Sequence, residues 1–343
     1  SRTFHGDRAG AEARLDELVA DVRAGRHGDA EITLGALLEV WLDAVHDDLS
    51  PTTYNEYARL SRNLLAPSPL GRSPVRKVTS ADLIAFYRAM KRSGRAVNTI
   101  RNVHAVLRGA LDYAVLAEWI DDNPAARARR PRGERRAIKP PTPDQVVALV
   151  TAAAAVNAEL AAFLRLAVAT GARRGELCGL RRSDVDLEAR TLHIQRAIVH
   201  DGDRLVVKDT KTHADRLRKI GPNAAIALRD HLEAMDKRAA DVGVRISKHA
   251  YVFSGRADCA TPMKPDTITT YFVTLRNSVG LKTVRLHDLR HFRVTQELDA
   301  GIPMPTVSEG AGHANSATTA GIYAHGTEPS SELAADVADD LFG

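Results

Sequence analysis

The stretch from Arg285 to His325 reads RLHDLRHFRVTQELDAGIPMPTVSEGAGHANSATTAGIYAH. It carries two histidines, an arginine and a late tyrosine at His287, Arg290, His313 and Tyr323. A tyrosine hydroxyl can attack phosphorus, and cationic or hydrogen-bonding side chains can stabilise the phosphate oxygens during that attack. The order and spacing of these residues therefore predict one phosphoryl-transfer site, with Tyr323 as nucleophile and His313 as a donor to the phosphate.

A second arginine lies far upstream, in the segment TGARRGEL at 170–177. Arg173 and Arg290 are suited to paired, planar contact with one phosphate, which lysine does not imitate. Cleaving a phosphodiester also needs an acid for the leaving oxygen and an acceptor for the nucleophile's proton. Lys211 is the candidate acid for the leaving 5′ oxygen, and His287 is the candidate acceptor or relay.

Neighbouring residues compete for two of these roles. An arginine in this segment is alternatively a surface salt-bridge partner, and Arg174 beside Arg173 is the candidate for the exposed member of the pair, because arginines are mostly surface residues. Lys208 and Lys219 lie near Lys211, which we prefer because it falls at or near a predicted hairpin turn.

The bulk composition indicates a folded protein of two domains with a polyanionic partner. The chain has 343 residues, a net charge of +5, 44% hydrophobic and 27% charged residues, and its length exceeds that of one ordinary core. From Arg127 to Lys139 it reads RARRPRGERRAIK, and prolines follow at once. This segment predicts an extended basic linker or, alternatively, a merely solvated hinge. Its candidate DNA contacts are Arg129, Arg130, Arg132, Arg135 and Arg136.

The segment before the linker predicts a small all-helical domain. Four helical patterns follow from Thr33 onward, with Thr33, Ser50, Ser80 and Asn98 at their starts. Polar side chains on the outward faces are suited to phosphates and base edges in a major groove. These further candidate DNA contacts are Arg59, Arg62, Arg101, Asn102 and Arg108.

The segment after the linker predicts a mostly helical domain with one small sheet. Leu192, Ile194, Arg196 and Ile198 alternate as in a strand. The segments DRLVVKD and RLRKIG flank Lys211 and predict a hairpin around it. Helices are expected at about 143–156, 157–170, 222–240, 265–279, 287–300, 303–310 and 315–323.

Together these boxes resemble the tyrosine recombinase family of the phage integrase type. TGARRGEL matches the first arginine box, with Glu176 as its companion acid; HDLRH matches the second, AGH the third, and IYAH the nucleophile segment. The Arg- and Ala-rich composition of the sequence is similar to that of integrases of actinobacterial phages or integrative elements. The resemblance implies a mainly α fold: a helical core-binding domain, and a mixed α+β catalytic domain with a small antiparallel sheet, in enzymes shaped like C-shaped clamps around duplex DNA.

The resemblance also implies a domain order and a reaction. Residues 1–31 would be the tail of an N-terminal arm-binding module, 32–127 the core-binding domain, 128–143 the linker, 144–327 the catalytic domain and 328–343 a helical tail. Site-specific recombination would proceed through a 3′-phosphotyrosyl intermediate and a Holliday junction, on double-stranded DNA attachment or core sites and in a homotetramer. No cofactor or metal is implied, and accessory directionality or DNA-bending proteins are candidate partners.

Two features depart from the family's usual pattern. The third box commonly reads as a helix ending in Leu-Gly-His, but this chain has Glu309, Gly310, Ala311 and Gly312 before His313, and Glu297 stands where a leucine is common. Both changes remove apolar packing, and Gly310 costs roughly 1 kcal/mol relative to alanine within a helix. The segment that carries His313 is therefore expected to be looser than usual or to dock differently.

Three other functions remain open on the sequence alone. His287 and His291 stand four apart, as zinc ligands on a helix do, but no third ligand is evident, and His291 is preferred as a structural histidine bonded within the fold. A DNA-binding regulator would not need Tyr323. A type IB topoisomerase would share the chemistry.

The remaining patterns concern location and assembly. Cys178 and Cys259 lie in unrelated contexts, and the sequence contains no apolar run long enough to cross a bilayer, so we expect reduced thiols, a cytoplasmic protein and no membrane partner. Leu333, Val337 and Leu341 recur at helical spacing, so we expect the tail to pack on the same or an adjacent protomer.

Overall fold

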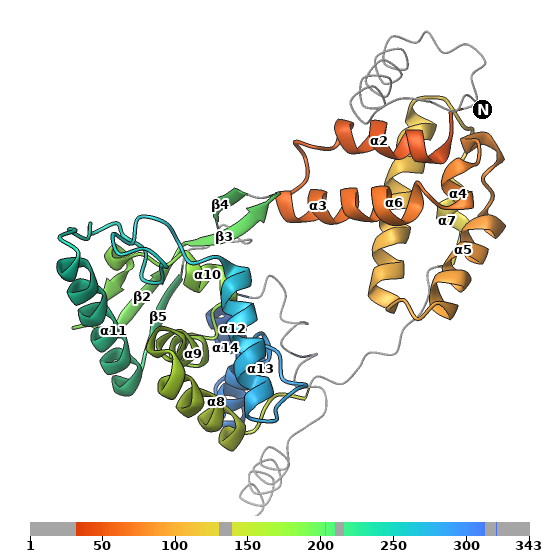
Figure 1. Ribbon diagram of the computed structural model, residues 1–343. Helices are drawn as coiled ribbons and strands as arrows, with labels where there is room; N and C mark the ends of the chain where they lie inside the picture. Colours follow the sequence, from red (N-terminus) through yellow and green to blue (C-terminus); the bar gives the residue numbers. More distant parts are fainter. Residues whose placement is uncertain (1–31, 130–138, 203, 210–215, 313–319, 321–343) are drawn as a thin grey trace, which may run out of the picture. The chain divides into compact units, whose positions relative to one another are not determined.

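The computed structural model describes residues 32–129, 139–202, 204–209, 216–312 and 320. The chain divides into two compact units, Ser1–Arg135 and Arg136–Gly343 (Figure 1). The division falls within the predicted linker. The expected arm-binding tail at 1–31 and the expected helices at 315–323 and 328–343 lie outside the described residues, apart from Ala320.

The first unit is entirely helical in its described residues. It contains α2 (Leu34–Ala44), α3 (Pro51–Leu60), a π-helical turn (Ser61–Leu65), α4 (Pro69–Arg72), a 3-10 turn (Val75–Lys77), α5 (Ser80–Arg92), α6 (Val97–Leu116) and α7 (Pro124–Arg127). Helix α6 packs against α2, α3 and α5, and its Ile100, Val103 and Leu107 are fully buried in the core. Gly109 allows the Trp41 ring close to α6, because a Cβ there would lie 2.6 Å from the ring.

Local capping explains where these helices begin. Thr33 accepts a hydrogen bond from the Ala36 backbone at 3.3 Å, and Ser50 caps α3 with Pro51 at its first position, as the sequence predicted. The predicted cap Asn98 is wrong, because it lies in the first turn of α6, and Ala96 at the N-cap makes no side-chain hydrogen bond. The predicted cap Ser80 is wrong by one residue. Thr79 is the cap instead, because it forms a reciprocal capping box with the Asp82 carboxylate.

The second unit is built around helix α9. Its helices are α8 (Pro143–Val156), α9 (Ala158–Thr170), α10 (Arg174–Cys178), a 3-10 turn (Arg182–Asp184), α11 (Pro222–Asp241), α12 (Pro265–Ser278), α13 (Asp288–Asp299) and α14 (Met304–Ala311). Helix α9 packs against α8, α11 and α13, and Phe163 at its centre meets Phe253 edge-on at 4.9 Å between ring centroids. The predicted helices agree with these to within two residues.

The strands form two antiparallel sheets, so the prediction of one sheet is wrong. They are β1 (Val185–Asp186), β2 (Thr191–Ile194), β3 (Arg196–Asp201), β4 (Arg204–Asp209) and β5 (Arg216–Lys219), in the orders β1-β2-β5 and β3-β4. The alternation from Leu192 to Ile198 therefore belongs to two successive strands, β2 and β3, which separate at Gln195.

The predicted hairpin around Lys211 is also wrong. Strand β4 pairs with β3 and strand β5 pairs with β2; Arg196 stands opposite Asp209, and Ile194 stands opposite Arg216. On the facing strand Gln195 alone separates the two ladders, and the tight turn lies at Gly202, whose φ is +57°. Lys211 itself lies outside the described residues.

Candidate functional site

The corner between α9 and α10 places Arg173. Helix α9 ends at Gly171, which adopts the left-handed conformation (φ +63°) that favours glycine. The Arg173 backbone N–H then donates to Oε2 of Glu176 at 2.7 Å, and its Nη1 donates to Oε1 at 2.8 Å. Glu176 thus closes the first turn of α10 and fixes the direction of the Arg173 side chain.

Glu176 also holds a second arginine, Arg216 at the start of β5. Nη2 of Arg216 donates to Oε2 of Glu176 at 2.6 Å, and Nη1 donates to Oε1 at 3.3 Å. Burial alone would raise the pKa of the Glu176 carboxyl, but hydrogen bonds and charge from Arg216 and Arg173 outweigh it and lower the pKa. The carboxylate is therefore ionised at neutral pH between two guanidinium groups.

Arg290 reaches the same corner from α13. It is only 2% exposed, and its Nη1 donates to the Gly171 carbonyl at 2.7 Å. Its Nη2 is buried and has no hydrogen-bond partner among the described residues. Burial, then the charge of Arg173, lowers the pKa of Arg290 to about 9, so it remains cationic at neutral pH. One donor of this guanidinium is thus left for an anionic oxygen.

The third box meets the first at Gly312. This residue ends α14 in the left-handed conformation (φ +66°), and its carbonyl accepts a hydrogen bond from Nη2 of Arg173 at 2.7 Å. A Cβ at this position would lie 2.9 Å from Nη1 of Arg216. The residue that immediately precedes His313 is therefore tied to Arg173.

His287 stands at the start of α13, beside Arg290. Asp288 accepts a hydrogen bond from the Arg285 backbone at 2.8 Å and fixes this turn. Loss of solvent around the ring, then the charge of Arg290, lowers the pKa of His287. The side chain is therefore mostly neutral at neutral pH, the form that accepts a proton.

His291 is buried at 8% exposure and packs edge-on against the His287 ring, with centroids 4.8 Å apart. Its Nδ1 has no hydrogen-bond partner in the described part of the chain. Within those residues, no group of three or more His, Cys, Asp or Glu side chains could hold a metal ion. The geometry therefore indicates a packing role for His291.

We expect His291 to make the fold sensitive to acid. Burial, then the charge of His287, lowers the pKa of His291 to about 4 from an ordinary 6.5. The unfolded chain therefore takes up this proton first, and roughly 3 kcal/mol of unfolding free energy is lost as the pH falls from about 6.5 to about 4. In urea titrations, His291→Leu should flatten this dependence and the exposed His249→Leu should leave it unchanged. Equal slopes in wild type and His291→Leu would contradict the prediction.

The structure thus brings Arg173, Glu176 and Arg290 together, with His287 beside them. Lys211, His313 and Tyr323 lie outside the described residues, so their places in the site stay predictions. Sequence reasoning missed Arg216, Gly171 and Gly312. The signal for Arg216 was the motif RLRK in β5, where arginine and leucine alternate.

The burial of β5 reverses the usual pattern of a strand. The side chains of Arg216 and Arg218 are 9% and 13% exposed, whereas Leu217 between them is 71% exposed. Two buried arginines need acidic partners, and both find them in Glu176 and Glu297. A strand with this reversed pattern therefore marks a buried group of charges.

The candidate DNA contacts of the first unit are exposed, as expected. Three of them pair with acids: Arg59 with Glu56 and Arg62 with Glu39, both at 2.9 Å, and Arg108 with Asp112 at 3.8 Å. The others are Arg101 and Asn102. In the linker Arg129 is exposed, and Arg130, Arg132, Arg135 and Arg136 lie outside the described residues.

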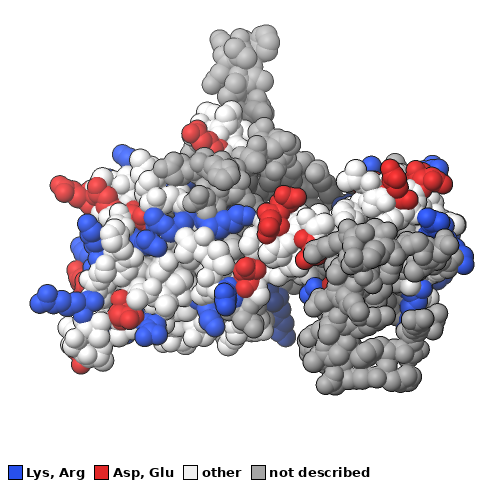
Figure 2. Space-filling model, turned by 90° about the horizontal axis from the view of Figure 1, so that it is seen from above, with Lys and Arg blue, Asp and Glu red and all other residues white. Residues whose placement is uncertain are grey.

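Charge is unevenly spread over the second unit. Figure 2 shows Lys and Arg side chains gathered in a row on one face of this unit, with acidic side chains more scattered. No helix in the described ranges combines the length and the apolar character needed to cross a bilayer.

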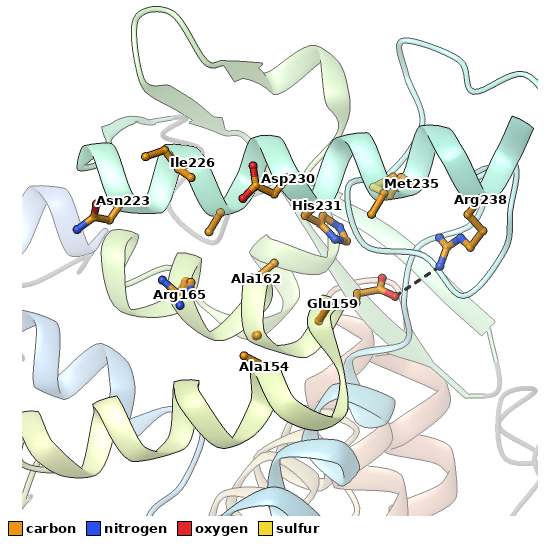
Figure 3. Close-up of a pocket in the computed structure, with 14 residues that line it drawn as sticks. Ala154, Glu159, Ala162, Arg165, Asn223, Ile226, Asp230, His231, Met235 and Arg238 are labelled. Atoms are coloured by element: carbon orange, nitrogen blue, oxygen red, sulfur yellow. Dashed lines mark ion pairs between the residues drawn. The ribbon is translucent and has the colours of Figure 1, made fainter.

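The described residues of the second unit line at least two cavities. One of about 360 Å³ adjoins the site and is lined by Arg290, His287 and Arg174 together with apolar side chains of α9 and α10. A larger one of about 630 Å³ lies between α9 and α11 (Figure 3) and contains none of the predicted site residues. Alanines line much of its floor, and the ion pair of Glu159 and Arg238, 3.8 Å apart, lies at one end. Of these two cavities, the smaller one is therefore the one lined by predicted site residues, His287 and Arg290.

Comparison with known families decides the identity of this arrangement. The model of the phage integrase family matches residues 141–329, more than half of the chain. The chain belongs to the phage integrase family. The matched range contains every predicted catalytic residue, and the enzyme class expected from the resemblance, that of the site-specific tyrosine recombinases, is confirmed.

Curated relatives of this integrase match over nearly its whole length. A tyrosine recombinase XerC-like protein of Caldanaerobacter subterraneus subsp. tengcongensis is 25% identical, covering 97% of this chain and 89% of the relative. The ICEBs1 integrase of Bacillus subtilis is 23% identical, with 96% and 88% covered.

Solved structures confirm the fold of this integrase. The Tn1549 transposon integrase in complex with transposon right end DNA is similar with a TM-score of 0.75 and 22% identity, covering 90% of this chain and 100% of that one. A lambda integrase tetramer bound to a Holliday junction is similar with a TM-score of 0.65 and 19% identity, covering 93% and 88%. The expected fold class is therefore confirmed.

Proposed function

We propose that Tyr323 of this integrase attacks a DNA phosphodiester and forms a 3′-phosphotyrosyl intermediate. The phenolic oxygen bonds to phosphorus as the bond to the 5′ oxygen breaks, and the 5′ hydroxyl leaves. In the reverse step a 5′ hydroxyl of the partner strand attacks the ester and releases tyrosine. The bond energy is conserved, so religation needs no nucleotide.

The observation that carries this proposal is the pair of guanidinium groups at the α9–α10 corner. Arg290 is fixed by the Gly171 carbonyl, and its buried Nη2 is still to be satisfied. Arg173 is fixed by Glu176 and Gly312, and its side chain remains 32% exposed. Cations that are preorganised in this way stabilise the charge that develops on a phosphoryl group during transfer.

The other groups complete the proton transfers. Neutral His287 takes or relays the proton of the tyrosine hydroxyl, Lys211 gives a proton to the leaving 5′ oxygen, and His313 donates to the phosphate. We further propose that four protomers act on two duplexes of attachment or core DNA, exchanging one pair of strands at a time through a Holliday junction. The named lambda integrase tetramer supports this proposal.

A nicked suicide substrate tests the proposal, because the short 5′ end diffuses away after cleavage and traps the ester. We expect a covalent adduct in the presence of EDTA, and peptide mapping should locate it at Tyr323. Inhibition by EDTA would instead favour a metal hydrolase, and absence of any adduct a DNA-binding regulator. Relaxation of plasmids that lack a specific site would favour a topoisomerase.

Replacing Arg290 with lysine should slow cleavage by about 10²- to 10³-fold. A lysine ammonium is a point charge and does not bridge the Gly171 carbonyl and a phosphate oxygen at once. Single-turnover cleavage at saturating DNA measures this, with Arg229→Lys on the exposed surface of α11 as the matched control. A rate for Arg290→Lys equal to that of the control would contradict the assignment.

A further inference from the structure

A group of three charges, of which Arg218 and Glu297 are largely buried and Arg293 is 34% exposed, lies beside the site. Nη2 of Arg218 on β5 donates to Oε1 of Glu297 on α13 at 3.1 Å. Arg293, one turn earlier on α13, donates to the same oxygen through Nε at 2.9 Å and through Nη2 at 2.8 Å. The Arg218 and Glu297 side chains are 13% and 10% exposed. Glu297 of this charge group stands at the position where the family commonly has a leucine.

Gly310 of α14 accommodates this charge group. A Cβ at position 310 would overlap Nη1 of Arg218 and lie 3.1 Å from its Cζ. The Arg218 guanidinium therefore lies against the backbone of α14, in space that Gly310 leaves open. The two departures at Glu297 and Gly310 are thus parts of one arrangement.

Few other contacts fix α14 to the body of the unit. Among the described residues, the apolar cluster between α13 and α14 contains only Val294, Val307 and Ala311, with Leu298 partly buried at its edge. This cluster is small compared with the core around α9. The Arg218 guanidinium, clamped between Glu297 and Gly310, is therefore a major part of what sets the position of α14.

The position of α14 determines where the third box begins. Its C-terminal Gly312 accepts the hydrogen bond from Arg173, and the next residue is His313. Strand β5, which carries Arg218, begins shortly after Lys211 in the chain and presents Arg216 to Glu176. Helix α13 carries Arg290. The charge group thus joins β5, α13 and α14, the three elements that place Arg216, Arg290 and Gly312 at the site.

We propose that Arg218 is a positioning residue of the recombinase. By bridging β5 to Glu297 and filling the space above Gly310, it sets the distance between α14 and α13, and so the place of Gly312, the residue before His313, relative to Arg173 and Arg290. This inference rests on the proposed function for its effect on catalysis, but not for its effect on packing.

A cycle of two substitutions tests the inference. Gly310→Ala and Arg218→Leu should each slow single-turnover cleavage by about 10- to 100-fold at saturating DNA, because small displacements of catalytic groups are costly. The affinity for DNA should be unchanged, which a general loss of folded protein would not produce. The double variant should be no slower than Arg218→Leu, because alanine then fits where the guanidinium was.

Thermal unfolding gives a readout that is independent of activity. Alanine is the better helix former, so Gly310→Ala should raise the Tm in the Arg218→Leu background and lower it when Arg218 is present. Gly255→Ala, at a glycine with open space around it, is the matched control. It should leave the cleavage rate unchanged, and its effect on the Tm should have the same sign with Arg218 present as in the Arg218→Leu background.

Two results would overturn the inference. One is a higher Tm for Gly310→Ala with Arg218 present; the other is wild-type cleavage by Arg218→Leu at a temperature where both proteins are folded. Failure of the proposed function looks different, because the wild-type protein would then give no adduct while the Tm cycle still reported on the packing.

Discussion

Replacing Tyr323 with phenylalanine is expected to abolish the covalent protein–DNA adduct, with a loss of about 10⁴-fold or more in cleavage rate. The substitution removes only the hydroxyl, so no oxygen remains to form the ester, and the cations around the phosphate cannot replace a nucleophile. The measurement is the adduct that survives denaturation on a nicked suicide substrate. Binding of duplex DNA by the variant should equal that of the wild type.

The matched control for this experiment is Tyr271→Phe. Tyr271 lies on α12 and is 43% exposed, so its hydroxyl is as accessible to solvent as a nucleophile would need to be. This control should form adduct at the wild-type rate. An undiminished adduct in Tyr323→Phe would refute the assignment of the nucleophile while leaving the enzyme class untouched.

Replacing Glu176 with glutamine is expected to have the largest effect on stability. The carboxylate is 3% exposed and lies within hydrogen-bonding distance of Arg173 and Arg216. Without its charge two guanidinium groups face each other uncompensated, and removal of one partner from a buried ion pair costs about 3–5 kcal/mol. Urea unfolding measures this loss, and cleavage should fall as well because Arg173 loses its support.

The pH dependence of the same variant gives a second check. The pKa of Glu176 is lowered in the fold, so its contribution is present above the unfolded value of about 4.5 and is lost as the pH falls through the folded value. Glu176→Gln should lack this loss at low pH. Glu233→Gln, at a side chain 71% exposed on α11, is the control and should keep it. A stability change for Glu176→Gln no larger than that of the control would contradict the prediction.

Local patterns were sufficient to predict the helices of this integrase. Thr33 and Ser50 were found as caps because their hydrogen bonds are made within a few residues. Thr79 was missed because Ser80 is an equally good capping residue, and the choice between them depends on which side chain Asp82 meets. The division of one apparent strand into β2 and β3 was missed because it depends on the strands that each one pairs with.

The candidate site was predicted in part for the same reason. Arg173, Glu176 and Arg290 stand in motifs that identify themselves by sequence. Arg216 and Arg218 do not, because a buried arginine is recognised only by the acid that it meets, and Glu176 and Glu297 are far from them in the chain. Long-range charge pairing is thus what the sequence alone left undetermined.

Strand β2 pairs with β5 and strand β3 pairs with β4. The registers of these two ladders are therefore independent of the number of residues between β4 and β5. Each ladder is anchored by its own register on either side of Gln195, so adding or removing residues between Asp209 and Arg216 shifts neither one. Under the proposed role of Lys211 as the acid, such changes of length are expected to alter the cleavage rate while both ladders keep their registers.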